Sequence, residues 1–261
     1  MYPDPLAWAA DGYCVVRSLV TPGHVRGLLG LMDRLDAGGA PRSARILYTH
    51  SPAPPDQPGL DRLMDQWMGA LGHHEAGAVH SLLMSMGEAV ATALGTAVVP
   101  FQDFLLRKTD RHEPFRWHQD RAFWPIVAEA GAVCWLALDA VDQSNGGVEV
   151  APGSHLGPKG ASIDLHTGLA QPGSPGAAWQ PPAGIVPRLE AGDALLFHSA
   201  CWHRSGRNAT QRPRRALAVS WVSSDARWCR EAAPRHPILS QTQEGQEVSA
   251  WSLGRYPYVR A

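Results

Sequence analysis

The sequence predicts a mainly β domain flanked by α-helices on its N-terminal side. Apolar residues recur at helical spacing between residues 20 and 95, and extended apolar runs bounded by turn residues follow over residues 96–224. The length of 261 residues, 44% of them hydrophobic, suits a single domain with a large core. We therefore expect one domain over residues 1–261, with helical packing elements mainly within 20–95 and the β core within about 96–224.

The N-terminal part is expected to contain one short helix-like piece, a strand around Tyr13–Val16 and three longer helices. Thr21 suits an N-cap, and Pro22 suits the first helical position. Residues 41–60 are rich in proline and form either a linker or a loop at a pocket mouth. Two further helices are expected in 60–95, with apolar stripes at Leu60, Leu63, Met64, Trp67 and Met68 and at Val79, Leu82, Leu83, Met86, Val90 and Leu94.

The β part is expected to contain strands at 97–108, 115–120, 133–138, 148–150, 185–189, 194–197 and 214–222. Residues 144–147 predict a tight turn, because Asn-Gly favours positive φ at both central positions. Residues 157–186 are rich in Gly, Pro and Ala and are typical of a lid or a binding loop. In the last strand, alternation puts the small residues Ala216, Ala218 and Ser220 on the face of Arg214, which leaves space for a bound molecule.

Composition gives no sign of a nucleic-acid or membrane partner. The formal net charge is −1, and no apolar run reaches the roughly 18 residues that a membrane-spanning helix needs. The four cysteines have no C-x-x-C spacing and are expected to be reduced thiols, and the N-terminus has no evident secretory signal. We expect a cytoplasmic protein with a small-molecule partner and leave its oligomeric state open.

The segment Trp117–Asp120 (WHQD) carries the most informative motif, H-x-D. On an extended strand, residues two apart point to the same face, so His118 and Asp120 would project into one pocket. An imidazole and a carboxylate are two of the three ligands in the facial triad that holds non-haem Fe(II). Taken alone, the motif also fits a hydrogen-bonded structural pair.

Further motifs follow in a characteristic order. They are Trp202–Asn208 (WHRSGRN), Arg214–Leu217 (RRAL), Trp135–Asp139 (WLALD), Asn145–His155 (NGGVEVAPGSH) and Asp11–Val16 (DGYCVV). Together with WHQD, these segments resemble the phytanoyl-CoA dioxygenase (PhyH-like) family of Fe(II)/2-oxoglutarate oxygenases. The resemblance covers most of the chain and says little about the substrate.

The resemblance implies a double-stranded β-helix core, the jelly-roll or cupin-like fold, with His118, Asp120 and His203 as ligands of Fe(II). In such a barrel, strands about 85 positions apart in sequence can be neighbours across the mouth. It also implies that Arg214, eleven residues after His203, binds the far carboxylate of 2-oxoglutarate with help from Ser205. Arg suits this role because its planar guanidinium binds a carboxylate in bidentate fashion.

Several other residues are candidates for the same pocket. Gln102 and Lys108 are expected to bind the cosubstrate or line its pocket, unless they lie on a solvated strand face. Arg121 would meet an anionic substrate group or lie in solvent. Arg215 is expected to point away from Arg214. Aromatic side chains near the motifs suggest an apolar or ring-bearing substrate, namely Phe123, Trp124 and Trp135.

The expected activity is hydroxylation of an unactivated C–H bond in a small molecule of natural-product type, with O₂ and 2-oxoglutarate consumed and succinate and CO₂ released. Desaturation, cyclisation and epimerisation stay open as outcomes of the same cofactors. A carboxylate at Asp120 argues against halogenation, because related halogenases have Gly or Ala there. A non-catalytic jelly-roll binding protein and a zinc hydrolase with the same ligands are the alternatives of other classes. The remaining histidines of note are expected to be structural or exposed, namely His73, His74, His80 and His155.

Overall fold

The strands form two principal antiparallel sheets in the computed structural model, which describes residues 4–37, 63–158, 160, 183–233 and 236–249. The larger, six-stranded sheet has the order β1 (Tyr13–Val16), β8 (Ala194–His198), β6 (Gly131–Ala137), β10 (Arg214–Ser223), β3 (Val98–Lys108) and β2 (Asp65–Met68). The three-stranded sheet consists of β4 (Phe115–His118), β9 (His203–Ser205) and β7 (Val148–Val150). A short pair joins β11 (Arg227–Trp228) to β5 (Ile126–Val127).

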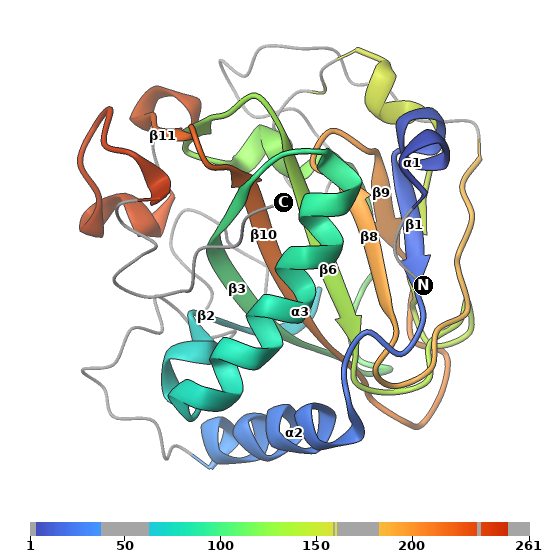
Figure 1. Ribbon diagram of the computed structural model, residues 1–261. Helices are drawn as coiled ribbons and strands as arrows, with labels where there is room; N and C mark the ends of the chain where they lie inside the picture. Colours follow the sequence, from blue (N-terminus) through green and yellow to red (C-terminus); the bar gives the residue numbers. More distant parts are fainter. Residues whose placement is uncertain (1–3, 38–62, 159, 161–182, 234–235, 250–261) are drawn as a thin grey trace.

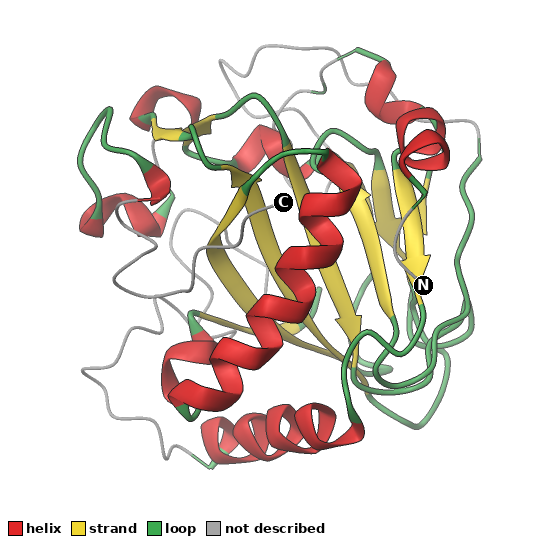
Figure 2. Ribbon diagram, viewed as in Figure 1, coloured by secondary structure: helices red, strands yellow, loops and turns green. Residues whose placement is uncertain are grey.

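Helices cover one face of the larger sheet (Figures 1 and 2). They are α1 (Pro5–Asp11), α2 (Pro22–Asp36) and α3 (Ala76–Leu94), and short 3₁₀ turns lie at Ala70–His73, Asp120–Phe123, Ser154–Leu156, Arg230–Ala232 and Pro237–Gln241. As the sequence predicts, Thr21 caps α2 and Pro22 is its first residue. Leu217, Val219 and Trp221 of β10 are buried in the core that this face shares with α3.

The opposite face of the larger sheet turns toward the three-stranded sheet. Here β10 presents Arg214, Ala218 and Ser220, and these side chains line a cavity whose other wall comes from β4, β7 and β9. The alternation predicted for this strand is therefore confirmed. Two antiparallel sheets that enclose a cavity, with neighbouring strands far apart in sequence, form the jelly-roll core that was expected.

The helix expected at residues 60–68 is wrong over its described part. Residues 65–68 form β2, which pairs with β3 at the edge of the larger sheet, with Trp67 opposite Leu105. All four residues of β2 are buried. Because both faces of this short strand carry buried side chains, its apolar residues do not alternate with polar ones, and their spacing also fits one face of a helix.

Two further local predictions need correction. The strand expected at 185–189 is reduced to isolated bridges at Ile185 and Leu189, because Pro187 between them has no N–H to donate.

In the Asn-Gly turn only Gly146 has positive φ, at 79°. The Asn145 side chain instead holds the turn by hydrogen bonds, since it accepts from the Asp142 N–H at 3.0 Å and donates to the Ala140 carbonyl at 2.7 Å.

The loops expected at 41–60 and, for the most part, at 157–186 lie outside the described residues. Among the residues that are described, no helix is both long and apolar enough to cross a membrane.

A buried carboxylate secures the edge strand β2. Asp65 accepts a hydrogen bond from Arg107 Nε at 2.7 Å, pairs with Arg111, and lies 3.2 Å from His112 Nε2. We expect Asp65→Ala to lower the free energy of unfolding by about 1–3 kcal/mol, because it leaves these donors without their acceptor. Urea unfolding tests this against Asp225→Ala, which removes an exposed carboxylate and should have almost no effect. Equal stability of the two variants would contradict the role of Asp65.

Candidate metal centre

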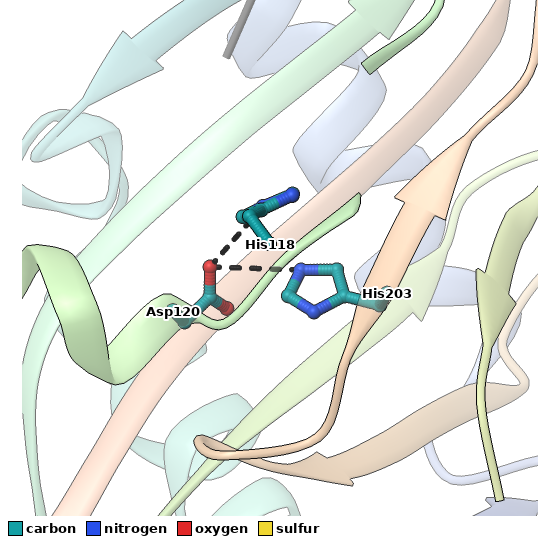
Figure 3. A group of neighbouring side chains, drawn as sticks. All are labelled: His118, Asp120 and His203. Carbon is teal, nitrogen blue, oxygen red and sulfur yellow. Dashed lines mark ion pairs between the residues drawn. The ribbon is translucent and has the colours of Figure 1, made fainter. Parts of the chain in front are cut away.

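Three side chains from two distant segments meet between the sheets. His118 Nε2 and His203 Nε2 each lie 3.6 Å from Asp120 Oδ1, and Figure 3 shows both rings beside this one carboxylate. Two ligand atoms on one ion, each about 2.1 Å from it, can be at most about 4.2 Å apart, so these spacings suit a shared ion. A separation of 3.6 Å is too long for a hydrogen bond, which argues against the structural-pair alternative. In the described chain this trio is the only cluster of its kind.

Local structure explains how the trio assembles. His118 ends β4 and His203 begins β9, and the two residues are direct partners in the antiparallel ladder. Gln119 is extended, with φ −118° and ψ 128°, so Asp120 returns to the side of His118 although it already belongs to a 3₁₀ turn. Gln119 points the other way, where its Nε2 donates to the Ala200 carbonyl at 2.6 Å.

Hydrogen bonds to the backbone fix both imidazole rings. His118 Nδ1 lies 2.8 Å from the Arg116 carbonyl, and His203 Nδ1 lies 3.1 Å from the Cys201 carbonyl. Each Nδ1 therefore carries the proton and donates it, which leaves the lone pair of each Nε2 facing Asp120. Metal-binding histidines are commonly oriented in this way.

Burial keeps both imidazoles of the trio in the neutral form that a cation requires. It lowers the pKa of His118, an effect that nearby His203 reinforces, and it lowers the pKa of His203; both values are about 4. At neutral pH both rings are neutral and can donate lone pairs. Burial also raises the pKa of Asp120, because a carboxylate without a counter-charge is costly there. The cluster thus offers two nitrogens and one oxygen to a divalent ion.

Arg214 is a buried cation with no hydrogen-bond partner among the described residues. It is 1% exposed, and all three of its guanidinium nitrogens are unpaired. The guanidinium lies 5.1 Å from the centre of the Trp135 ring, and burial lowers the pKa of Arg214 to about 10. An unpaired buried charge is costly, and a bound anion would relieve that cost.

Arg215 provides the contrast. Its side chain lies on the other face of β10, as predicted, where it binds Asp139 through Nε at 2.9 Å and through a second nitrogen at 2.7 Å. Of two adjacent arginines, Arg215 is paired with a carboxylate, and Arg214 faces the cavity with no hydrogen-bond partner among the described residues. The structure therefore singles out Arg214 as the anion-binding candidate.

A second cation lies beside Arg214. Lys108 is opposite Arg214 in the β3–β10 ladder, it is fully buried, and its Nζ lies 3.1 Å from Ser205 Oγ. Burial, with the nearby charges of Arg214 and Arg207, lowers the pKa of Lys108 to about 6. Ser205 itself lies two residues after His203 on β9. The trio therefore adjoins a compact group of N–H and O–H donors whose chemistry suits an anion.

The pKa of Lys108 predicts that 2-oxoglutarate binding takes up a proton. In the free protein Lys108 is mostly neutral above pH about 6, whereas a bound dianion favours the charged form and raises its pKa. Affinity should therefore weaken as pH rises above about 6. Calorimetry of the zinc-loaded protein in buffers of different ionisation enthalpy measures the uptake, and Lys108→Met should abolish it. Unchanged uptake in that variant would contradict the prediction.

The cavity has a volume of about 180 Å³, far more than the roughly 15 Å³ that one water needs. Besides the trio and Arg214, the sequence candidates Gln102, Ser205, Phe123, Trp124 and Trp135 line it. Arg121 is exposed and is not among the lining residues, and neither is Lys108, which contacts the lining residue Ser205 from behind the cavity wall.

Some lining residues were not singled out from the sequence. Phe115 on β4 packs beside His118, with 5.9 Å between the ring centres. Phe197 on β8 packs beside His203, with 4.5 Å between the ring centres. His236 reaches the cavity from the C-terminal segment, where no periodic pattern indicated an element. Alternation along the last strand predicts that Ser220 lies on the same face as Arg214, but the sequence indicates no role for it.

Comparison with known proteins agrees with this geometry. Residues 8–216 match the sequence model of the family described as phytanoyl-CoA dioxygenase (PhyH). The chain belongs to the phytanoyl-CoA dioxygenase (PhyH) family. This PhyH-family chain is 34% identical over 132 residues to the peroxisomal phytanoyl-CoA dioxygenase of Rattus norvegicus, which is 47% of the chain and 36% of the rat protein. It is 29% identical over 146 residues to a probable alpha-ketoglutarate-dependent hypophosphite dioxygenase of Stutzerimonas stutzeri, covering 54% and 48%.

The match thus spans only about a third to a half of these relatives' length. Solved structures resemble the PhyH-family chain over more of its length. The epimerase SnoN in complex with Fe³⁺, alpha ketoglutarate and nogalamycin RO aligns over 93% of each chain with a TM-score of 0.69 and 20% identity. The carbocyclase SnoK from nogalamycin biosynthesis aligns over 93% of this chain and 90% of its own with a TM-score of 0.67 and 17% identity. At such identities the likeness confirms the predicted fold class.

Proposed function

We propose that this PhyH-family protein is an Fe(II)/2-oxoglutarate-dependent oxygenase that hydroxylates an unactivated C–H bond of a small molecule of natural-product type. The observation that carries the proposal is a pairing of two features in one cavity. A trio of two neutral imidazoles and a carboxylate lies on one wall. On the other lies a buried guanidinium that no side chain or carbonyl of the described residues pairs with. The first suits Fe(II) and the second suits the far carboxylate of a keto-diacid.

His118, Asp120 and His203 would hold the iron, and the backbone hydrogen bonds of both rings keep their Nε2 atoms available. Arg214, Ser205 and Lys108 would bind the distal carboxylate, with Trp135 keeping the guanidinium in place. Bound iron with 2-oxoglutarate and O₂ supplies the oxidation of a C–H bond, with the overall balance R–H + 2-oxoglutarate + O₂ → R–OH + succinate + CO₂. Aromatic side chains line the space where the substrate would lie and would shield its apolar body from water.

Other outcomes use the same residues. The similar structures include an epimerase and a carbocyclase. Which outcome follows depends on the substrate and its position in the cavity. We also propose a cytoplasmic location, because all four cysteines are free thiols, which suits a reducing compartment.

The test is succinate release by purified protein with Fe(II), ascorbate, O₂ and 2-oxoglutarate, alone and with a library of cyclic natural products. We expect slow release without substrate and faster release with a true substrate, accompanied by a product heavier by one oxygen atom. Release in neither condition, with 2-oxoglutarate still bound, would favour the non-catalytic binding protein. Turnover of a substrate with zinc and without 2-oxoglutarate would favour the hydrolase.

A further inference from the structure

The cavity has a second polar end. Gln102 is opposite Ser220 in the β3–β10 ladder, six positions along each strand from the Lys108–Arg214 pair. Six residues of extended strand span about 20 Å, so the two polar groups lie toward opposite ends of the cavity. Gln102 was expected to serve the cosubstrate, but this register separates it from the cations that would bind 2-oxoglutarate.

A directed chain of hydrogen bonds runs through this distal end. His236 Nδ1 accepts the Ile238 N–H at 3.3 Å, so the ring proton is on Nε2. His236 Nε2 then donates to Gln102 Oε1 at 3.0 Å, which fixes the orientation of the amide. Gln102 Nε2 donates in turn to Ser220 Oγ at 3.0 Å. Burial lowers the pKa of His236 to about 4, which agrees with a neutral ring.

The direction of the chain determines what remains available to a ligand. Ser220 Oγ already accepts a hydrogen bond, so its own O–H is left to donate, and Gln102 has a second amide N–H. Both residues are buried and both line the cavity. This end therefore has one free amide N–H and one free O–H, and an acceptor oxygen on a ligand can bind both of them.

Among the described lining residues, none at the Gln102–Ser220 end of the cavity carries a charge. The charged side chains of the lining are Asp120 in the trio, Arg214 at the cosubstrate end, and Arg204, which pairs with Glu149 at 2.6 Å. The surroundings of the distal donors are apolar and aromatic, including Trp124, which packs edge-on against Phe101 at 5.0 Å. An ionic group placed here would lose its hydration without gaining a partner.

We propose that Gln102 and Ser220, oriented by His236, form the subsite that recognises the substrate, and that the substrate is a neutral ring-bearing molecule with a hydrogen-bond-accepting oxygen such as a ketone or ether. Its oxygen binds the two donors, and its apolar body lies against Trp124 toward the metal trio. The inference rests on the proposed function for the position of the cosubstrate. It excludes small inorganic anions and places the specificity of the enzyme in β3, β10 and the C-terminal segment.

Binding of small bicyclic probes tests the subsite without turnover. The probes are tetralone, which has an acceptor oxygen, tetralin, which has none, and the carboxylate and amine derivatives of tetralin. Their dissociation constants are measured by ligand-observed NMR on the zinc-loaded full chain with 2-oxoglutarate. We expect tetralone to bind about three- to tenfold tighter than tetralin, as one or two neutral hydrogen bonds would give, and both charged probes to bind more weakly than tetralone.

Ser220→Ala should reduce the preference for tetralone to less than twofold. The matched control is Ser223→Ala, on the same strand and also buried but outside the cavity lining, which should keep the preference. Three results would overturn the proposal: no difference between tetralone and tetralin in the wild-type protein, including no binding of either; tightest binding of a charged probe; or an unchanged preference in Ser220→Ala. Binding of 2-oxoglutarate is followed separately by calorimetry, and its loss would instead contradict the proposed function.

Discussion

Replacing His203 by alanine is expected to reduce Fe(II)-dependent succinate release by at least about 100-fold, because loss of a residue that only supports a ligand already costs about 10–100-fold in affinity or activity. His203 would supply one of three ligand atoms in the proposed site, and the centre of its ring lies 4.1 Å from that of His118. The measurements are iron affinity and succinate release at saturating 2-oxoglutarate. The fold should remain intact, because the His203 side chain lines the cavity and does not belong to the core under the helices.

The matched control is His80→Ala, which removes an exposed imidazole from α3. It should leave iron affinity and succinate release unchanged. If His203→Ala retained wild-type iron affinity, the three residues would not form the metal centre.

Arg214→Met should raise the dissociation constant of 2-oxoglutarate by at least about 30-fold. Removing one partner of a buried charge pair costs about 2–5 kcal/mol, and each 1.4 kcal/mol corresponds to about tenfold in affinity. The ligand-free variant should be as stable as the wild type or more stable, because methionine replaces a buried guanidinium that has no partner in the described chain. Calorimetry and thermal unfolding measure the two effects. If Arg214 served only to stabilise the fold, Arg214→Met would lower the unfolding temperature instead.

Arg215→Met serves as the control in the adjacent position. It breaks the two hydrogen bonds to Asp139 on the far face of the strand, so it should lower stability and leave 2-oxoglutarate affinity within about twofold. Reversal of the two phenotypes would assign the cosubstrate to Arg215 and contradict the proposed site.

Long elements and the pair His118 and Asp120 could be predicted from sequence because each rests on a local rule. The strand at 98–108, the capped helix α2 and the alternation in β10 follow from periodicity and capping. His118 and Asp120 follow from their spacing, whereas only the family resemblance brought in His203. The structure supplies the physical reason, since β4 pairs directly with β9.

Other features depend on contacts that no local pattern records. Residues 65–68 are buried on both faces, so their apolar spacing does not distinguish a strand from a helix. Gln102 and Lys108 lie on one strand and looked equivalent, and only the register with β10 separates them between the two ends of the cavity. His236 joins the cavity through a hydrogen bond to a residue 134 positions away, which sequence spacing cannot reveal.

The central claim is that one metal ion and one molecule of 2-oxoglutarate share this cavity. A crystal structure of the protein grown with Mn²⁺ and 2-oxoglutarate tests it most directly. We predict an ion bound by His118 Nε2, His203 Nε2 and an Asp120 oxygen, with the distal carboxylate of 2-oxoglutarate paired to the Arg214 guanidinium. An ion bound elsewhere, or a bound 2-oxoglutarate that leaves Arg214 unpaired, would contradict the account.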